Sequence, residues 1–246
     1  MSTNTIYLIS GANRGIGRGL TAAYLSRDNT TIIAAVRDLS HATSQSLASL
    51  PKGKDSTLIV VKIDSLSHSD PAAAIATLPA HSIPHIDVLI ANAGVLEVNR
   101  VTDITVAEYR YHQDVNTIGP LLLLQAAWEL LQKAPRPKFV VVASQLGSVA
   151  VGPKAALASG SYGASKASIN YLLRKLHFEN PGLIALPICP GMTQTDMGAH
   201  VATAMGREKA TVTLEDSVKG VVQEIDNATR TADGRFASYQ HVDLPW

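Results

Sequence analysis

Residues 5–17 read TIYLISGANRGIG, an apolar run that leads directly into a glycine-rich loop. The run Thr5–Ser10 has the largely continuous apolar pattern of a strand that is buried on both faces. Glycines after such a strand let the backbone approach a pyrophosphate, whose charge sits at the N-terminus of the next helix. The spacing G-x-x-x-G-x-G differs from the G-x-G-x-x-G dinucleotide fingerprint, so a purely structural turn stays open as an alternative. The candidate cofactor-binding residues of the loop are Gly11, Asn13, Arg14, Gly15, Ile16 and Gly17.

The rest of the chain repeats this alternation of strand and helix. Further strand-like runs are Thr31–Val36, Thr57–Ile63, Ile86–Ala91, Lys138–Ser144 and Leu183–Ile188. Helical spacing is found in Arg18–Asp28, Ser40–Ser49, Asp70–Leu78, Val106–Ala134 (interrupted at Gly119-Pro120) and Tyr162–Glu179. Residues 213–227 are predicted to form a helix with Thr213 as N-cap and Asp216 in the capping-box position, and residues 234–239 a last strand. The pattern predicts an α/β protein with one domain over residues 1–246, whose doubly wound, mostly parallel sheet is covered by helices on both faces.

The composition excludes several classes of protein. Of the 246 residues 46% are hydrophobic and 17% are charged, and the net charge is +1, so no nucleic-acid or membrane-surface partner is predicted. We find no apolar segment long enough to span a bilayer and no signal-peptide pattern. The single cysteine, Cys189, excludes an internal disulfide and fits a reducing compartment, so a cytoplasmic protein is expected. The eight histidines show no paired metal-ligand spacing, and no metal is predicted.

Two arginines indicate which dinucleotide the loop would bind. An NAD site places an acidic residue at the end of the second strand, to bind the adenosine ribose hydroxyls. This chain has Arg37 at that place and Arg14 inside the glycine loop. Two guanidinium groups can hold the 2′-phosphate of NADP through paired, charge-assisted hydrogen bonds. The sequence therefore favours NADP(H) over NAD(H). The alternative for Arg37 is that it forms an ion pair with the neighbouring Asp38 and binds no phosphate.

Polar motifs follow the later strands in a fixed order. They are Asp64 after the third strand, Asn92-Ala93-Gly94 after the fourth, Asp114-Val115-Asn116, Ser144 at the end of the fifth, Tyr162-Gly163-Ala164-Ser165-Lys166 and Pro190-Gly191 after the sixth. In this order the motifs resemble the short-chain dehydrogenase/reductase family over essentially the whole chain. The resemblance implies a Rossmann fold, a nicotinamide cofactor and the interconversion of a carbonyl group and an alcohol.

The pair Tyr162 and Lys166 has the chemistry that this reaction needs. The two residues are four positions apart and therefore share one face of a helix. An ammonium group favours a phenolate, so we expect Lys166 to lower the pKa of Tyr162 from its ordinary value of about 10. Such a tyrosine can give a proton to a carbonyl oxygen or take one from an alcohol, while the cofactor carries the hydride.

The resemblance also implies roles for the other motif residues. Ser144 would hydrogen-bond the substrate oxygen, and Lys166 would also hold the nicotinamide ribose. Asn116 would anchor a water in a proton relay to Lys166. The remaining cofactor contacts implied are Asp64, Asn92, Ala93, Gly94, Tyr162, Pro190, Gly191 and Thr195. Structural roles stay open for three of them: Asn116 as a polar residue inside a helix, Ser144 as a strand-end cap, and Thr195 as a helix N-cap.

Two serines are candidates for the catalytic position. Ser144 lies eighteen residues before Tyr162, farther than is usual in the family, and Ser148 lies fourteen before it. Ser144 is preferred because the fifth strand ends on it, and residues 151–159 would then form an enlarged loop. That spacing, Asn92–Leu96 and the tail Leu244-Pro245-Trp246 narrow the resemblance to norsolorinic acid ketoreductases, sniffer-type carbonyl reductases and C-factor proteins. The narrower match implies NADPH-dependent reduction of a ketone, such as a polyketide or another aromatic ketone.

Substrate selection is expected in the loops 95–101, 146–161 and 192–213. The candidate lining residues are Leu96, Leu146, Val149, Met192, Met197 and Met205, with Glu97 and His200 as polar candidates. A homo-oligomer, a dimer or a tetramer, is favoured, with residues 121–133 and 162–179 as candidate interface helices and a monomer left open. Two other functions remain open: an NAD-linked dehydrogenase or epimerase, and a protein that senses the NADP redox state without turnover.

Overall fold

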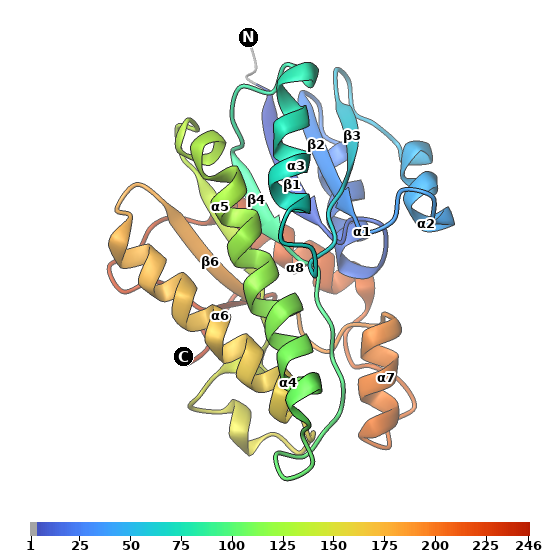
Figure 1. Cartoon of the computed structure of the whole chain (residues 1–246), viewed down its shortest axis with the longest axis vertical. Coiled ribbons are helices and arrows are strands. Elements are labelled where there is room, and N and C mark those ends of the chain that lie inside the picture. The colour runs from blue at the N-terminus through green and yellow to red at the C-terminus, as the bar shows by residue number, and fades with distance from the viewer. Residues whose placement is uncertain (1–3) are drawn as a thin grey trace.

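The computed structural model describes residues 4–246, and over that range seven strands form one sheet in the order β3-β2-β1-β4-β5-β6-β7 (Figure 1). Every neighbouring pair in this sheet is parallel. The strands are β1 (Thr5–Ser10), β2 (Thr30–Val36), β3 (Thr57–Lys62), β4 (Val88–Ala91), β5 (Lys138–Val142), β6 (Ile184–Cys189) and β7 (Ala237–Ser238). The helices are α1 (Gly15–Leu25), α2 (Ala42–Gln45), α3 (Asp70–Thr77), α4 (Val106–Gln113), α5 (Gly119–Gln132), α6 (Gly160–Glu179), α7 (Asp196–Ala204) and α8 (Leu214–Asn227).

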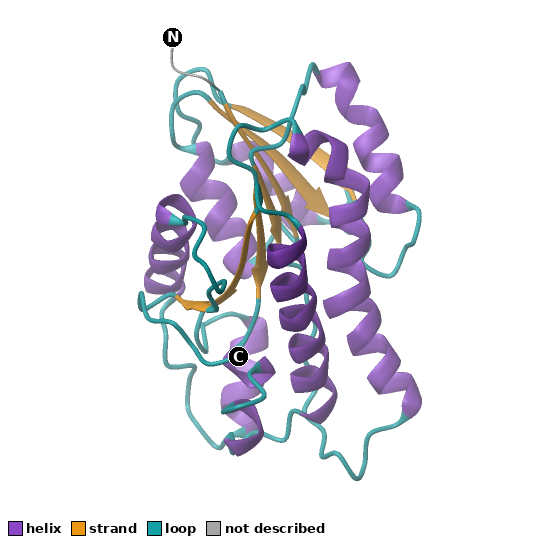
Figure 2. Ribbon diagram, turned by 90° about the vertical axis from the view of Figure 1, so that its left-hand side faces the viewer, coloured by secondary structure: helices purple, strands orange, loops and turns teal. Residues whose placement is uncertain are grey.

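Both faces of the sheet are covered, which explains why the strand sequences are apolar throughout. Successive side chains of a strand point to opposite faces. In β1, Ile6 and Leu8 pack into a core with residues of α3, α5 and α6, whereas Tyr7 and Ile9 pack into a second core with residues of α1 and α8. Figure 2 shows the two helical layers on either side of the sheet. The architecture is the doubly wound Rossmann fold that the sequence predicts.

Several local boundaries differ from the prediction. The long segment predicted over residues 106–134 is α4 and α5 joined by a π-helical turn, Asp114–Ile118. The fifth strand ends at Val142 rather than at Ser144, and the last strand covers Ala237–Ser238 alone. Helix α7 lies inside the segment that was expected to be a substrate loop. Hydrophobic periodicity predicts that a helix or strand is present, whereas the residues at which it begins and ends depend on contacts with distant parts of the chain.

The cap of α8 forms much as predicted. The Thr213 hydroxyl accepts a hydrogen bond from the Asp216 backbone N–H at 3.0 Å. The Asp216 carboxylate accepts from the Thr213 hydroxyl at 2.7 Å, and this bond replaces the one to the Thr213 backbone that a full capping box would contain. The cap fixes the start of a helix whose apolar side completes the second core.

Candidate active site

A cleft of about 1630 Å³ runs along the carboxyl ends of the strands. It opens where the strand order reverses between β1 and β4, the place at which open α/β sheets bind their ligands. Of the cofactor and catalytic residues predicted from the sequence, all line this cleft except Gly17 and Asn116. The cleft therefore gathers residues that are far apart in the chain, from Gly11 to Leu244, as ligand clefts of such sheets do.

The glycine loop lies at one wall of the cleft. Gly11 and Gly15 have φ values of +64° and +51°, a region that residues with a side chain rarely adopt. A Cβ on Gly17 would overlap the Gly11 carbonyl oxygen, so only glycine fits there, although Gly17 does not itself line the cleft. Helix α1 begins at Gly15, and its N-cap, Arg14, makes no side-chain cap bond. The first N–H groups of α1 are thus available to an anion such as a diphosphate.

Hydrogen bonds join the glycine loop to the end of β4. The Ser10 hydroxyl accepts from the backbone N–H groups of Asn92 and Ala93, at 3.0 and 3.1 Å. The Asn92 side-chain amide donates to the Ser10 carbonyl oxygen at 2.9 Å and to that of Gly11 at 3.3 Å. Asn92 lines the cleft, and its amide is used to hold the two strand ends together.

Arg37 follows β2, is exposed and lines the same cleft as the glycine loop. Over residues 4–246 it makes no salt bridge, and the Asp38 carboxylate instead accepts from the Ser40 backbone and hydroxyl, which lowers the pKa of Asp38. The alternative Arg37–Asp38 pair is therefore not formed. Arg14 lies 3.5 Å from the Asp196 carboxylate at the start of α7, in an exposed and therefore weak pair.

Two further residues at this end of the cleft were not predicted. The Asn13 amide donates to the Thr43 hydroxyl at 2.6 Å, and that oxygen lies 2.8 Å from His41 Nδ1. Thr43 and His41 both line the cleft beside Arg37. Nothing in the local sequence marks them, because they belong to a short helical turn rather than to a motif. Asp64, at the end of β3, also lines the cleft, and its carboxylate caps the following turn by accepting from the Leu66 N–H at 3.0 Å.

Tyr162, Lys166 and Ser144 line the cleft together at the ends of β5 and α6. Tyr162 and Lys166 lie on one face of α6, with Lys166 Nζ 5.8 Å from the centre of the tyrosine ring. The Lys166 ammonium donates to the Val142 carbonyl oxygen at 2.8 Å. Both side chains are buried, at 6% and 4% exposure, so their protonation depends on the site rather than on bulk water.

Burial controls the two pKa values. It raises the pKa of Tyr162 above its ordinary range, and the neighbouring Ser144 side chain opposes this rise. Burial also lowers the pKa of Lys166 to about 8. The expectation that the pKa of Tyr162 lies below its ordinary value is therefore wrong, because loss of water around the phenolate outweighs the hydrogen bond from Ser144 that lowers this pKa. Tyr162 keeps its proton at neutral pH, the form that a general acid needs.

The two candidate serines have different surroundings. The Ser144 hydroxyl lies on the cleft wall, although it also accepts from the Leu146 N–H at 3.2 Å. Ser148 is 1% exposed and does not line the cleft. Its hydroxyl accepts from the Val151 N–H at 3.2 Å and donates to the main-chain oxygen of Trp246 at 3.3 Å. Only Ser144 can reach a substrate in the cleft.

Asn116 lies in the π-helical turn, fully buried and behind the cleft wall. Its side chain forms a closed pair with Val95: Oδ1 accepts from the Val95 N–H and Nδ2 donates to the Val95 carbonyl oxygen, both at 2.9 Å. Nδ2 also donates to the Ser165 hydroxyl at 3.0 Å. The side chain thus positions the loop after β4. The π turn, with its local shift of the helix, carries a polar residue as such turns often do at functional sites.

The loop after β6 combines cleft-lining and capping roles. Gly191 has a φ of +76°, and a Cβ there would meet the Tyr239 ring at 2.7 Å. The Thr195 hydroxyl accepts from the Gly198 N–H at 3.2 Å and so caps α7, as the structural alternative for this residue states. Thr195 also lines the cleft, as does Pro190.

The predicted substrate-lining residues all lie in the cleft except Val149, which is 74% exposed on the outer side of its loop. Glu97 and His200 line the cleft as well. The buried His112 was missed: its Nδ1 lies 2.8 Å from the Glu108 carbonyl oxygen, and its Nε2 accepts from the Glu97 N–H at 3.0 Å. His112 therefore positions the loop that carries Glu97.

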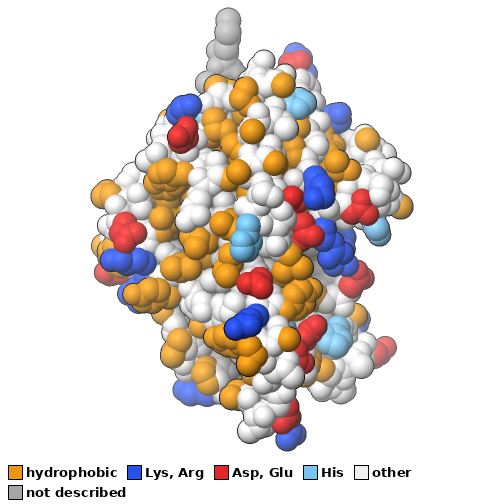
Figure 3. All heavy atoms as spheres, in the orientation of Figure 1, with side chains coloured by type: hydrophobic (Ala, Val, Ile, Leu, Met, Phe, Trp, Pro, Cys, Tyr) orange, Lys and Arg blue, Asp and Glu red, His pale blue; other side chains and the backbone are white. Residues whose placement is uncertain are grey.

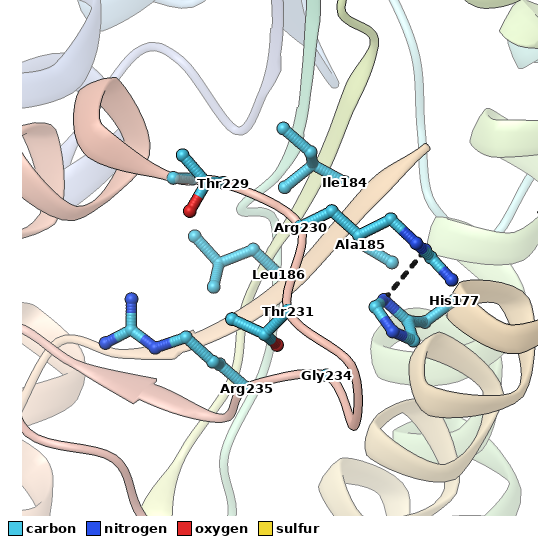
Figure 4. A pocket seen from close by; sticks show the side chains of 10 residues that line it. His177, Ile184, Ala185, Leu186, Thr229, Arg230, Thr231, Gly234 and Arg235 are labelled. Carbon is cyan, nitrogen blue, oxygen red and sulfur yellow. Dashed lines mark hydrogen bonds between the residues drawn. The ribbon is translucent and has the colours of Figure 1, made fainter. Parts of the chain in front are cut away.

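A second hollow lies between β6 and the segment after α8 (Figure 4), and its volume of about 10 Å³ has room for a single water. There the Arg230 guanidinium points toward His177, with 3.1 Å between Nη1 and Nδ1.

Within residues 4–246, no three His, Cys, Asp or Glu side chains are placed to hold a metal ion. Over the same range, none of the helices has the length and apolar character to cross a membrane. Figure 3 shows acidic and basic side chains interspersed on the face that it draws.

Comparisons with known proteins agree with this arrangement. A family model described as short chain dehydrogenase matches residues 5–206. The norsolorinic acid ketoreductase of Dothistroma septosporum is 41% identical to the chain, over 100% of the chain and 94% of that protein. A short-chain dehydrogenase of Pyricularia oryzae is 39% identical, over the full length of both.

Solved structures show the same fold. The NADPH-bound carbonyl reductase from chicken fatty liver matches with a TM-score of 0.87 and 27% identity, over 100% of both chains. The carbonyl reductase Sniffer of D. melanogaster matches with a TM-score of 0.83 and 23% identity, over 99% of this chain and 100% of that one, and shows the fold alone. With its glycine loop, parallel sheet and Ser144, Tyr162 and Lys166 gathered in one cleft, the chain belongs to the short chain dehydrogenase family of oxidoreductases.

Proposed function

We propose that the protein reduces a ketone to an alcohol with NADPH, and that Tyr162 is the general acid. The observation that carries this proposal is the single cleft that holds the glycine loop and Arg37 at one end and Tyr162, Lys166 and Ser144 at the other. The cofactor, when bound, supplies the hydride. The cradle fits a dinucleotide, because side chains are excluded at Gly11, Gly15 and Gly17 and the start of α1 faces the cleft.

Each residue of the cleft then has a defined task. The Ser144 hydroxyl donates a hydrogen bond to the carbonyl oxygen and orients it toward Tyr162. Tyr162 gives its phenolic proton to that oxygen as negative charge develops. The Lys166 ammonium, held by the Val142 carbonyl, stabilises the phenolate that remains. Asn116 acts on these groups through the Val95 loop and through Ser165 on α6.

The preference for NADPH rests on Arg37. Its guanidinium lies exposed at the adenosine end of the cleft with no acidic partner among residues 4–246, so it can bind a 2′-phosphate. Arg14 can contribute a second guanidinium once it leaves Asp196, because the exposed pair is weak. The chicken carbonyl reductase that matches the chain is described as NADPH-bound, which supports the same cofactor.

The substrate proposed is a polyketide or another aromatic ketone. The substrate end of the cleft is lined by Leu146, Leu157, Met192, Met197 and Met205, which suit a large apolar or aromatic molecule. The relatives from Dothistroma septosporum and Emericella nidulans are named ketoreductases, at 41% identity each. A panel of aliphatic and aromatic ketones, with NADPH consumption followed by absorbance, tests the proposal. Tight NADPH binding without consumption on the whole panel would favour a redox sensor instead.

Substitution of the two serines tests the role of Ser144. We expect Ser144→Ala to lower kcat about 100-fold, as loss of an oxyanion hydrogen-bond donor does. Ser148→Ala should lower kcat by no more than about threefold, because its hydroxyl does not reach the cleft. Steady-state kinetics on one ketone measure both. A larger loss of kcat in Ser148→Ala than in Ser144→Ala would reverse the assignment.

The pKa of Lys166 predicts the pH dependence of reduction. Because burial lowers this pKa to about 8, the ammonium is present at neutral pH and is lost as the pH rises through that value. Reduction should therefore be level below about pH 7 and fall above about pH 8, since neutral lysine no longer stabilises the phenolate. A pH–rate profile measures this, and Lys166→Arg should move the fall to higher pH because guanidinium stays charged. An unchanged fall in Lys166→Arg would contradict the assignment.

The protein is further proposed to form a homo-oligomer through α5 and α6. Tyr171 and Phe178 on α6 are 70% and 52% exposed, which is unusual for two aromatic side chains on one helix. Trp128 of α5 is partly buried and packs on the core, so it contributes to the interior. Light scattering coupled to size-exclusion chromatography decides between a monomer and an oligomer.

A further inference from the structure

Trp246 is held between a helix and the ends of two strands. The centre of its ring lies 5.9 Å from that of Phe236, and the Arg174 guanidinium lies 5.0 Å from the ring on the side of α6. The ring packs on a small cluster that contains Ala143 after β5 and Cys189 at the end of β6. Figure 1 shows the marked C-terminal end of the chain beside α6. Trp246 thus packs beside α6 and beside the ends of β5 and β6, the elements that form the catalytic part of the cleft.

The main chain of Trp246 binds the loop after β5. Its oxygen accepts from the Ala150 N–H at 3.1 Å and from the Ser148 hydroxyl at 3.3 Å. The same hydroxyl accepts from the Val151 N–H at 3.2 Å, so one buried serine joins the loop to the tail. The Gly152 N–H donates to the Ser148 carbonyl oxygen at 2.8 Å, which closes the turn. These bonds go to an irregular loop and not to the sheet, so their loss leaves the strand ladder intact.

This loop is a wall of the cleft. Ser144 begins it, and Leu146, Val151 and Leu157 line the cleft farther along. The tail reaches the same space, because Leu244 lines the cleft and its N–H donates to the Phe236 carbonyl oxygen at 2.7 Å. A shift of the tail would therefore move both the loop and one of its neighbours in the cleft wall.

We propose that Trp246 and Ser148 are positioning residues, which hold residues 144–157 in the shape that orients the ketone beside Ser144. This proposal rests on the proposed ketone reduction and adds to it the residues that keep the ketone oriented. The glycine loop follows β1 and Arg37 follows β2, whereas the tail lies beside β5 and β6 on the other side of β4, so we expect the tail to act on ketone binding more than on NADPH binding. Ser148 has no direct contact with the reacting atoms and acts through Trp246 and Val151.

Trp246→Ala tests the proposal. The variant should raise the KM for the ketone about tenfold and lower kcat about threefold, since a loosened wall misplaces the substrate by fractions of an ångström. The dissociation constant of NADPH should stay at the wild-type value. Ser148→Ala should raise the ketone KM several-fold in the same direction, which provides a second, milder variant if Trp246→Ala folds poorly. Trp246→Phe keeps a ring against Phe236 and Arg174 and should restore most of the wild-type KM.

Val242→Ala is the matched control, because Val242 is in the same tail and is 52% exposed. It should leave KM, kcat and NADPH binding unchanged. The proposal is overturned if Trp246→Ala and Ser148→Ala keep the wild-type ketone KM. Equal losses in ketone and NADPH binding would also overturn it, since they indicate a general loss of structure.

Hydrogen–deuterium exchange separates this proposal from the proposed function, because it needs no turnover. Backbone amides of residues 144–157 should exchange faster in Trp246→Ala than in the wild type or in Val242→Ala, while those of β1 and α1 do not change. Unchanged exchange in the loop would refute the positioning role even if the enzyme reduces ketones. If the loop exchanges faster in Trp246→Ala but the wild type reduces no ketone, the positioning role of Trp246 stands and the proposed reaction is refuted.

Discussion

Tyr162→Phe is expected to lower kcat for ketone reduction about 1000-fold, within the range that a positioned general acid contributes. Phenylalanine keeps the ring in its buried place and removes only the proton donor. The pKa of Tyr162 is raised by burial, so the wild-type residue carries its proton throughout neutral pH and the full effect should be seen there. NADPH binding, measured by fluorescence titration, should remain within about twofold of the wild type, because the glycine loop and Arg37 are untouched.

Tyr109→Phe is the matched control, since Tyr109 lies on α4, does not line the cleft and is 42% exposed. It should leave kcat unchanged. Turnover by Tyr162→Phe near the wild-type rate would remove Tyr162 as the acid, and a large loss of NADPH affinity would show that the hydroxyl mainly serves binding.

Arg37→Ala should weaken NADPH binding about 10- to 100-fold, the effect of losing one or two hydrogen bonds to a charged group. NADH lacks the 2′-phosphate, so its affinity should change by less than about twofold. The ratio of the two dissociation constants, measured by titration at one ionic strength, isolates the phosphate from the rest of the dinucleotide.

Arg110→Ala serves as the control for net charge, because Arg110 is exposed on α4 and does not line the cleft. It should leave both dissociation constants as they are. Equal losses for NADPH and NADH in Arg37→Ala would give Arg37 a structural role. Tighter binding of NADH than of NADPH by the wild type would support the NAD-linked alternative.

The fold could be predicted because its signals are local. Each strand is an apolar run. The glycines of the first loop indicate a backbone conformation that other residues rarely adopt, and Gly11 and Gly15 do have positive φ values. The positions of Tyr162 and Lys166 on one helical face follow from their spacing alone. The cleft then follows from the parallel sheet, because the carboxyl ends of its strands meet along one edge.

Contacts between distant segments could not be predicted in this way. The hydrogen bond between Ser148 and Trp246 joins residues 98 positions apart, and the sequence around either residue does not predict the other as its partner. The pKa of Tyr162 was misjudged because spacing shows which groups are neighbours but not how much water reaches them. No motif singled out His112, which the fold buries and uses to bind the Glu97 backbone.

The bonds between Ser10 and Asn92 also join the two strand ends between which the cleft opens. Strand β4 pairs with β1 only over Tyr7–Ile9, so this seam is shorter than its neighbour between β1 and β2. The hydrogen bonds of Ser10 with Asn92 and Ala93 close the seam just beyond its last pair. The two strand ends on which a dinucleotide would lie are therefore joined by side-chain bonds at the point where the strand pairing stops.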